Sequence, residues 1–118
     1  MTHKGGRDAL RVAAMIEAAE QARQDAGGSK EEFVRPGLVQ KAVLLDLIHL
    51  TESAEKTSVE LKRLNADIPW TRLSRLRNQG LVHDYEEVDL EDLWSFVRNE
   101  LPRIRRRLDR MRFPRDTA

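Results

Sequence analysis

Four residues with side chains suited to phosphate chemistry lie close together in this sequence, namely Arg77, Asn78, His83 and Tyr85. Histidine accepts and donates protons near neutral pH, and the planar guanidinium of arginine binds phosphate oxygens. A histidine that takes the proton of a ribose 2′-hydroxyl, and an arginine that stabilises charge on the attacked phosphorus, would together cleave RNA without a metal. The set is therefore a candidate ribonuclease site.

The spacing of Arg77 and His83 does not place them together on a straight helix. Over the six steps from Arg77 to His83 a helix turns through a net angle of roughly 120° and rises about 9 Å. They meet only if the chain breaks near Gly80, or if two subunits converge at a two-fold axis. A purely structural interpretation stays open, in which Arg77 pairs with Asp84 or Glu86 and His83 caps a helix.

The elements that hold these residues are predicted to be helices. The chain has 118 residues, of which 40% are hydrophobic and 35% charged, and only six glycines and four prolines. This composition fits one domain over 1–118, with flexible termini at about 1–6 and 113–118. We expect an all-α, up-and-down four-helix bundle with additional short helices. The main helices are predicted at about 7–26, 38–55, 69–79 and 89–111, and the short ones at about 29–36 and 57–64.

Local signals mark the helix ends. Gly27 suits a left-handed helix stop, and Ser29 and Thr57, each followed by a glutamate three residues on, are predicted N-caps. Asp89 is predicted to begin the last helix. Pro102 lies inside that helix and should disturb it near the carbonyl of Arg98.

The helix predicted over 38–55 carries two apolar stripes. Leu47 and Leu50 belong to one, which Asp46 interrupts, and Leu44 and Ile48 belong to the other. A helix that is apolar on two sides is buried on both. We therefore expect it to be central, with one side against its own bundle and the other against a second subunit.

The absence of cysteine excludes disulfides and thiolate zinc sites, and it fits a reducing cytoplasm. No apolar run is long enough to span a membrane, and residues 1–11 lack a signal-peptide stretch. We expect a cytoplasmic protein that does not bind membranes, and we expect no metal or cofactor.

Positive charge collects at the end of the chain. Residues 101–118 hold seven arginines against two aspartates, a net charge of +5, while the other hundred residues carry a net charge of −4. Such an end attracts a polyanion, and it equally describes a solvated helix whose cations favour the negative end of its dipole. The RNA-binding candidates are Arg103, Arg106, Arg107 and Arg110.

The motifs Ile68-Pro69-Trp70, Arg77-Asn78…His83-Asp84-Tyr85 and Leu101-Pro102 resemble HepT-like proteins. These are ribonuclease toxins of the HEPN superfamily, paired with MNT-type nucleotidyltransferase antitoxins. The resemblance extends upstream through 39–43 and 50–54 and covers roughly 7–110.

The resemblance implies a HEPN helical bundle and a homodimer, or a higher oligomer, with its RNA-cleaving cleft at the subunit interface. Arg77 and His83 match the catalytic pair of the family, and Asn78 matches its supporting polar position. Tyr85 matches the tyrosine that the antitoxin modifies with AMP in some members. The implied partners are an RNA substrate and a nucleotidyltransferase antitoxin.

An alternative function rests on two departures from the HepT-like pattern. This chain has one residue more between Arg77 and His83 than those proteins usually have, and it places Glu86 and Glu87 after the tyrosine. Under this alternative the protein is a non-catalytic HEPN dimer that acts as an interaction or nucleotide-binding module. A purely structural oligomer, in which the same side chains form interface ion pairs, is a third hypothesis.

Overall fold

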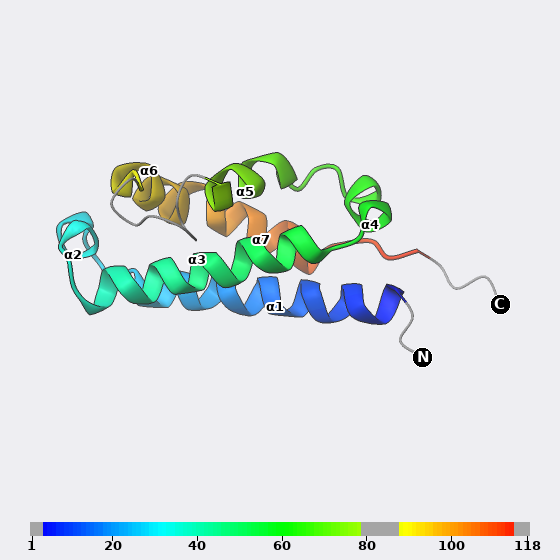
Figure 1. Ribbon diagram of the computed structural model, residues 1–118, viewed down its shortest axis with the longest axis horizontal. Helices are drawn as coiled ribbons and strands as arrows, with labels where there is room; N and C mark the ends of the chain where they lie inside the picture. The colour runs from blue at the N-terminus through cyan, green and yellow to red at the C-terminus, as the bar shows by residue number, and fades with distance from the viewer. Residues whose placement is uncertain (1–3, 79–87, 115–118) are drawn as a thin grey trace.

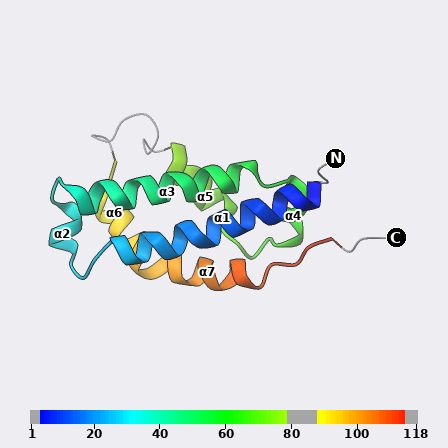
Figure 2. The ribbon, with the colours of Figure 1, turned by 90° about the horizontal axis from the view of Figure 1, so that it is seen from below.

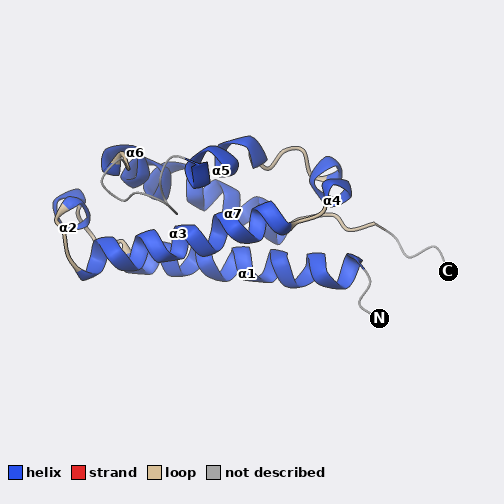
Figure 3. Ribbon diagram, viewed as in Figure 1, coloured by secondary structure: helices blue, strands red, loops and turns tan. Residues whose placement is uncertain are grey.

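The computed structural model describes residues 4–78 and 88–114. These residues form helices and loops and include no strand (Figure 3), which confirms the all-α prediction. The helices are α1 (Lys4–Asp25), α2 (Lys30–Val34), α3 (Leu38–Lys56), α4 (Val59–Leu64), α5 (Trp70–Leu76), α6 (Leu90–Ser95), a π-helical turn η3 (Phe96–Glu100) and α7 (Leu101–Asp109).

The long helices run up and down along one axis of the molecule. In Figure 1, α1 and α3 are antiparallel, α5 runs back over α3, and α6, η3 and α7 return toward the C-terminus. Figure 2 shows α1 between α3 and α7. The short helices α2 and α4 lie at opposite ends of this arrangement, which measures 53 × 26 × 23 Å. The predicted up-and-down order is therefore confirmed.

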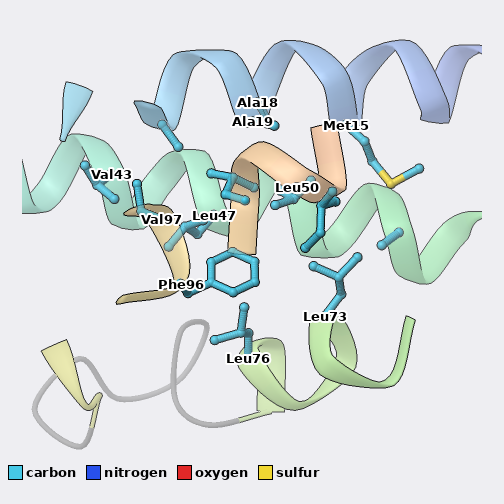
Figure 4. Packing of buried hydrophobic residues seen from close by; sticks show 14 of the residues in the cluster. Met15, Ala18, Ala19, Val43, Leu47, Leu50, Leu73, Leu76, Phe96 and Val97 are labelled. Atoms are coloured by element: carbon cyan, nitrogen blue, oxygen red, sulfur yellow. The ribbon is translucent and has the colours of Figure 1, made fainter. Parts of the chain in front are cut away.

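The core is built from apolar side chains that every long helix contributes. Met15, Leu47, Leu73 and Phe96 are each at most 1% exposed. In Figure 4 the ring of Phe96 faces Leu76 of α5 on one side and the α3 residues on the other. Burial of such side chains contributes roughly 1.5–3 kcal/mol each relative to exposure, so the bundle rests on this apolar contact.

Most predicted helix ends are correct. Gly27 has a positive φ of 70° after α1, and the Ser29 hydroxyl accepts a bond from the Glu32 N–H at 3.2 Å. The Asp89 carboxylate accepts the N–H groups of Glu91 and Asp92, both at 3.1 Å. These contacts satisfy backbone donors that a helix start leaves free.

The predicted cap at Thr57 is wrong by one residue. Ser58 caps α4 by accepting the Leu61 N–H at 3.2 Å. Thr57 ends α3 instead, because its hydroxyl already donates to the Ser53 carbonyl at 2.9 Å. The Asp8 carboxylate of α1 accepts both the N–H and the hydroxyl of Ser58, which ties this junction to the first helix.

The last long helix departs from α geometry where Pro102 predicts it. In η3 the Leu101 N–H donates to the Phe96 carbonyl, five residues back, in place of the α-helical partner. Proline has no N–H and its ring crowds the carbonyl of Arg98, so the wider turn removes the conflict. One predicted helix is therefore three consecutive elements. Phe96, the first residue of η3, is fully buried.

Helix α3 is buried on one side and exposed on the other within this chain. Leu47 and Leu50 are fully buried, and Leu44 is 4% exposed. Leu38 and Leu45, two turns apart on the other side, are 85% and 52% exposed. This exposed side is not the stripe predicted to face a second subunit, because Leu44 and Ile48 of that stripe pack with the core of this chain. Contact of α3 with a second subunit stays a prediction.

Asp46 is buried between α1 and α3, and its Oδ2 atom has no hydrogen-bond partner among the described residues. Burial raises the pKa of its carboxyl to about 7, and the Asp25 carboxyl adds to the rise through a hydrogen bond and its charge. Glu17, His49 and Glu52 line the adjoining surface hollow. A buried carboxylate without a cation costs folding free energy.

Replacement of this group should make the protein more stable in alkali. Because the folded protein holds the Asp46 proton more tightly than the unfolded chain, the group's contribution to stability falls as pH rises from about 4 to about 7. The Asp46→Asn variant should exceed the wild type by about 1 kcal/mol near pH 8, a value reduced for solvent screening. The difference should disappear near pH 4. Urea unfolding of the variant and the wild type measures this difference in the free energy of unfolding, and Asp67→Asn, at an exposed aspartate, serves as control. Equal differences at pH 4 and pH 8 would contradict a raised pKa of Asp46.

No helix among the described residues combines the length and the apolarity that a membrane crossing requires.

Candidate active site

Helix α5 presents the candidate arginine at its carboxyl end. Pro69 precedes the helix, and the Trp70 indole N–H donates to the Asn65 carbonyl at 3.0 Å, which anchors its first turn. Leu73 and Leu76 point into the core, as Figure 4 shows. Two buried leucines one turn apart fix the rotation of the helix, and this rotation determines where the residue after Leu76 lies.

That residue is Arg77, whose guanidinium has no ion-pair partner in the described part of the chain. Its backbone N–H donates to the carbonyls of Leu73 and Ser74, so the backbone is held. The side chain is half-buried, and Nε is buried without a hydrogen-bond partner among residues 4–78 and 88–114. An arginine at a helix carboxyl end is electrostatically favoured. Within the described part of the chain, no carboxylate neutralises its charge.

Asn78 follows directly and is exposed. His83 and Tyr85 lie outside the described residues, as do Asp84 and Glu86. The structure therefore brings Arg77 and Asn78 together at the end of α5. The pairing of Arg77 with His83, and the alternative pairing with Asp84 or Glu86, stay predictions.

Sequence reasoning missed a cation beside this site. Arg72 of α5 bonds both carboxylate oxygens of Glu100 and both of Asp92, at 3.1–3.2 Å. These partners are 20 and 28 residues away in the sequence, and no local pattern indicates such a contact. The hydrogen bonds to Glu100, with those to Asp92, raise the pKa of Arg72 against the opposing effect of burial.

The four candidate RNA-binding arginines of the last helix region are all exposed. Arg103, Arg106 and Arg110 form no ion pair with any carboxylate among the described residues. Arg107 donates to the Asp67 carbonyl, at 2.6 Å. Arg105, which is not a candidate, pairs with Glu20 at 2.8 Å and with Asp109 at 3.1 Å. Three of the four candidates thus have no carboxylate partner in the part of the chain that the structure describes.

The described residues hold no group of three histidine, aspartate or glutamate side chains that converges as a metal site would require.

The family model for ribonuclease HepT-like proteins matches residues 15–111 of the chain. The chain belongs to the ribonuclease HepT-like family. This confirms the family assignment made from the sequence motifs. The matched stretch includes Arg77, Asn78, His83, Tyr85 and the arginines of α7.

Several curated proteins are similar to this HepT-like chain. A probable ribonuclease HepT of Thermococcus cleftensis is 30% identical over 82 residues, which cover 70% of this chain and 74% of that protein. Two proteins provisionally named as RNases are more distant. One from Caldanaerobacter subterraneus is 23% identical over 70% of this chain and 72% of its own. One from Methanocaldococcus jannaschii is 26% identical over 66% of this chain and 71% of its own. No solved structure is significantly similar to this HepT-like chain.

Proposed function

We propose that this HepT-like protein is a metal-independent endoribonuclease toxin that cleaves RNA with Arg77 and His83. The observation that carries the proposal is the ribonuclease family match, which spans both residues. The Arg77 side chain adds support, since no described carboxylate neutralises its charge. We place the reaction in the cytoplasm, which the cysteine-free composition fits.

In this mechanism His83 removes the proton of a ribose 2′-hydroxyl, and the 2′-oxygen attacks the adjacent phosphorus. The P–O5′ bond breaks as the P–O2′ bond forms. The products are a 2′,3′-cyclic phosphate and a 5′-hydroxyl, whose proton comes from the His83 imidazolium formed in the first step. Arg77 stabilises the charge that grows on the phosphoryl oxygens, and Asn78 orients the phosphodiester. A planar guanidinium whose charge no described carboxylate neutralises suits this role.

The active unit is proposed to be a homodimer, in which copies of these residues converge at a two-fold axis. The exposed Leu38 and Leu45 of α3 support it, because they form an apolar strip beside a hollow lined by Gln40, Lys41 and Leu44. Exposed apolar side chains that share one helix face, unlike single ones such as Val59, are typical of surfaces that a partner covers.

The proposed partner is an MNT-type nucleotidyltransferase antitoxin that adds AMP to Tyr85. A nucleotide there would bring bulk and negative charge to an RNA-binding cleft and repel the substrate phosphate. Incubation with the cognate nucleotidyltransferase, ATP and Mg²⁺ should add one AMP mass to the wild type and none to Tyr85→Phe. A modified Tyr85→Phe variant would show that the acceptor is another residue.

Arg103 and Arg106 of α7, with Arg110 directly after it, are proposed to bind the RNA backbone at a distance from the cleaved bond. Removal of two of them, as in Arg106→Gln/Arg110→Gln, should weaken RNA binding at low salt by about tenfold. The double substitution should also make RNA binding less sensitive to salt, because binding with fewer phosphate contacts releases fewer counterions. Filter binding at several salt concentrations measures both. The matched control is Arg105→Gln, because the Arg105 side chain is already paired with Glu20. Equal losses of RNA affinity in the two variants would contradict a specific role for Arg106 and Arg110 in RNA binding.

The test of the function itself is RNA cleavage by the purified protein in excess EDTA, with the product ends analysed. We expect 2′,3′-cyclic phosphate ends and growth arrest on expression without the antitoxin. Metal-dependent cleavage, or ends of another type, would contradict the mechanism. A folded dimer that binds the nucleotidyltransferase but leaves RNA intact would instead support the non-catalytic module.

A further inference from the structure

We propose that Arg72 is a positioning residue for cleavage, which holds the carboxyl end of α5, and with it Arg77, against α6 and η3. The inference rests on the proposed function, because it assigns Arg72 a role in the reaction of Arg77. Arg72 itself is committed to two carboxylates and is therefore not a phosphate ligand.

The contacts of Arg72 join α5 to α6 and η3, the first two elements after residues 79–87. Its Nε and Nη2 donate to the two oxygens of Glu100 at 3.2 and 3.1 Å. Nη2 also donates to the two oxygens of Asp92, at 3.1 and 3.2 Å. The fork of the guanidinium allows this two-point contact with one carboxylate, which fixes direction as well as distance.

A buried ring supports the same guanidinium from one face. The carbon at its centre lies 5.3 Å from the centre of the Phe96 ring, and Phe96 is fully buried in η3. The Arg72 side chain is only 21% exposed. The side chains of Asp92 and Glu100 are 39% and 41% exposed, so salt screens these ion pairs in part. The cation over the ring adds its own attraction. The cluster Arg72, Asp92, Glu100 and Phe96 is thus an ordered contact rather than a loose surface pair.

The position of Arg72 on α5 explains why its contacts would matter for the reaction. Arg77 follows Arg72 by five residues, which is about 7.5 Å along a helix. Helix α5 has only seven residues, and such a short helix has little stability of its own. Leu73 and Leu76 hold one side of it on the core, while Arg72 holds another side on α6 and η3. Without Arg72 the end of α5 can shift, and a displacement of about 1 Å at a reacting group can cost about 100-fold in rate.

The test compares steady-state RNA cleavage by Arg72→Gln, Arg72→Lys and Glu100→Gln, with Arg105→Gln as the matched control. Arg105 also pairs with two carboxylates, but on α1 and α7. We expect kcat to fall by about 10- to 100-fold in Arg72→Gln with KM nearly unchanged, because positioning and not binding is lost. Arg72→Lys should recover part of kcat, since it keeps the charge but not the fork. The control should retain wild-type kcat.

A second measurement separates positioning from general stability. In an Arg77→Lys background, Arg72→Gln should lower kcat much less than it does in the wild type, because two residues that act through one group are not additive. A full, independent loss in that background would overturn the inference, as would wild-type kcat in a folded Arg72→Gln protein. If Arg72→Gln does not fold, Glu100→Gln is tested in its place, for the fall in kcat and for the smaller fall in the Arg77→Lys background. Undiminished cleavage by Arg77→Ala would instead refute the proposed function.

Discussion

Replacement of Arg77 by alanine should lower the rate of RNA cleavage by about 100- to 1000-fold, the usual cost of losing a group that stabilises transition-state charge. Replacement of His83 by alanine should cost about 100- to 10,000-fold, because a positioned general base contributes that much. The structural reason is clearest for Arg77. Its backbone is held at the end of α5, and its guanidinium makes no ion pair with any described residue. Stability should change little when such a side chain is removed.

The measurement is single-turnover cleavage of a labelled RNA in EDTA, with circular dichroism to verify folding. Arg75 supplies the matched control, since it lies on the same helix two residues earlier and is exposed. Arg75→Ala should cleave at the wild-type rate. If Arg77→Ala and His83→Ala also cleave normally, these residues take no part in the mechanism. If they lose thermal stability together with activity, the interface ion-pair hypothesis gains support.

A glutamate at Leu45 should separate the subunits and abolish most of the activity. Leu45 is 52% exposed in the single chain, and Leu38 on the same strip is 85% exposed. Replacement of Leu45 therefore opens no cavity in the core. In a dimer that covers this strip, two glutamates would be buried near the symmetry axis without partners, which costs several kcal/mol. A loss of about 4 kcal/mol would raise the dissociation constant about 1000-fold. Cleavage should fall with it, because the proposed cleft takes residues from both chains.

Light scattering at several protein concentrations measures the subunit mass, and the same samples are tested for RNA cleavage. Val59→Glu is the control, because Val59 is an exposed apolar residue of α4 outside the α3 strip. It should leave both mass and activity unchanged. A Leu45→Glu protein that stays dimeric would show that the subunits meet at another surface. A monomer with full activity would show that one chain holds a complete site.

Much of the fold could be predicted because its determinants are local in sequence. The stops and caps at Gly27, Ser29 and Asp89 each act within a few residues, and the steric effect of Pro102 acts within one turn. Apolar periodicity predicted the long helices, and short connections predicted their antiparallel order. The error at Thr57 has a local cause too. Two adjacent hydroxyl residues compete for one cap, and the Asp8 carboxylate of another helix favours Ser58.

By itself, the sequence determined the helices, their order, the membership in a ribonuclease family and the identity of Arg77, Asn78, His83 and Tyr85 as candidates. Only the tertiary structure showed that Arg77 makes no ion pair in the described part of the chain while Arg72 binds two carboxylates. Two arginines five residues apart look equivalent in a sequence. They differ because Asp92 and Glu100, distant along the chain, are folded against only one of them. Contacts of this kind depend on how helices pack, which no local pattern encodes.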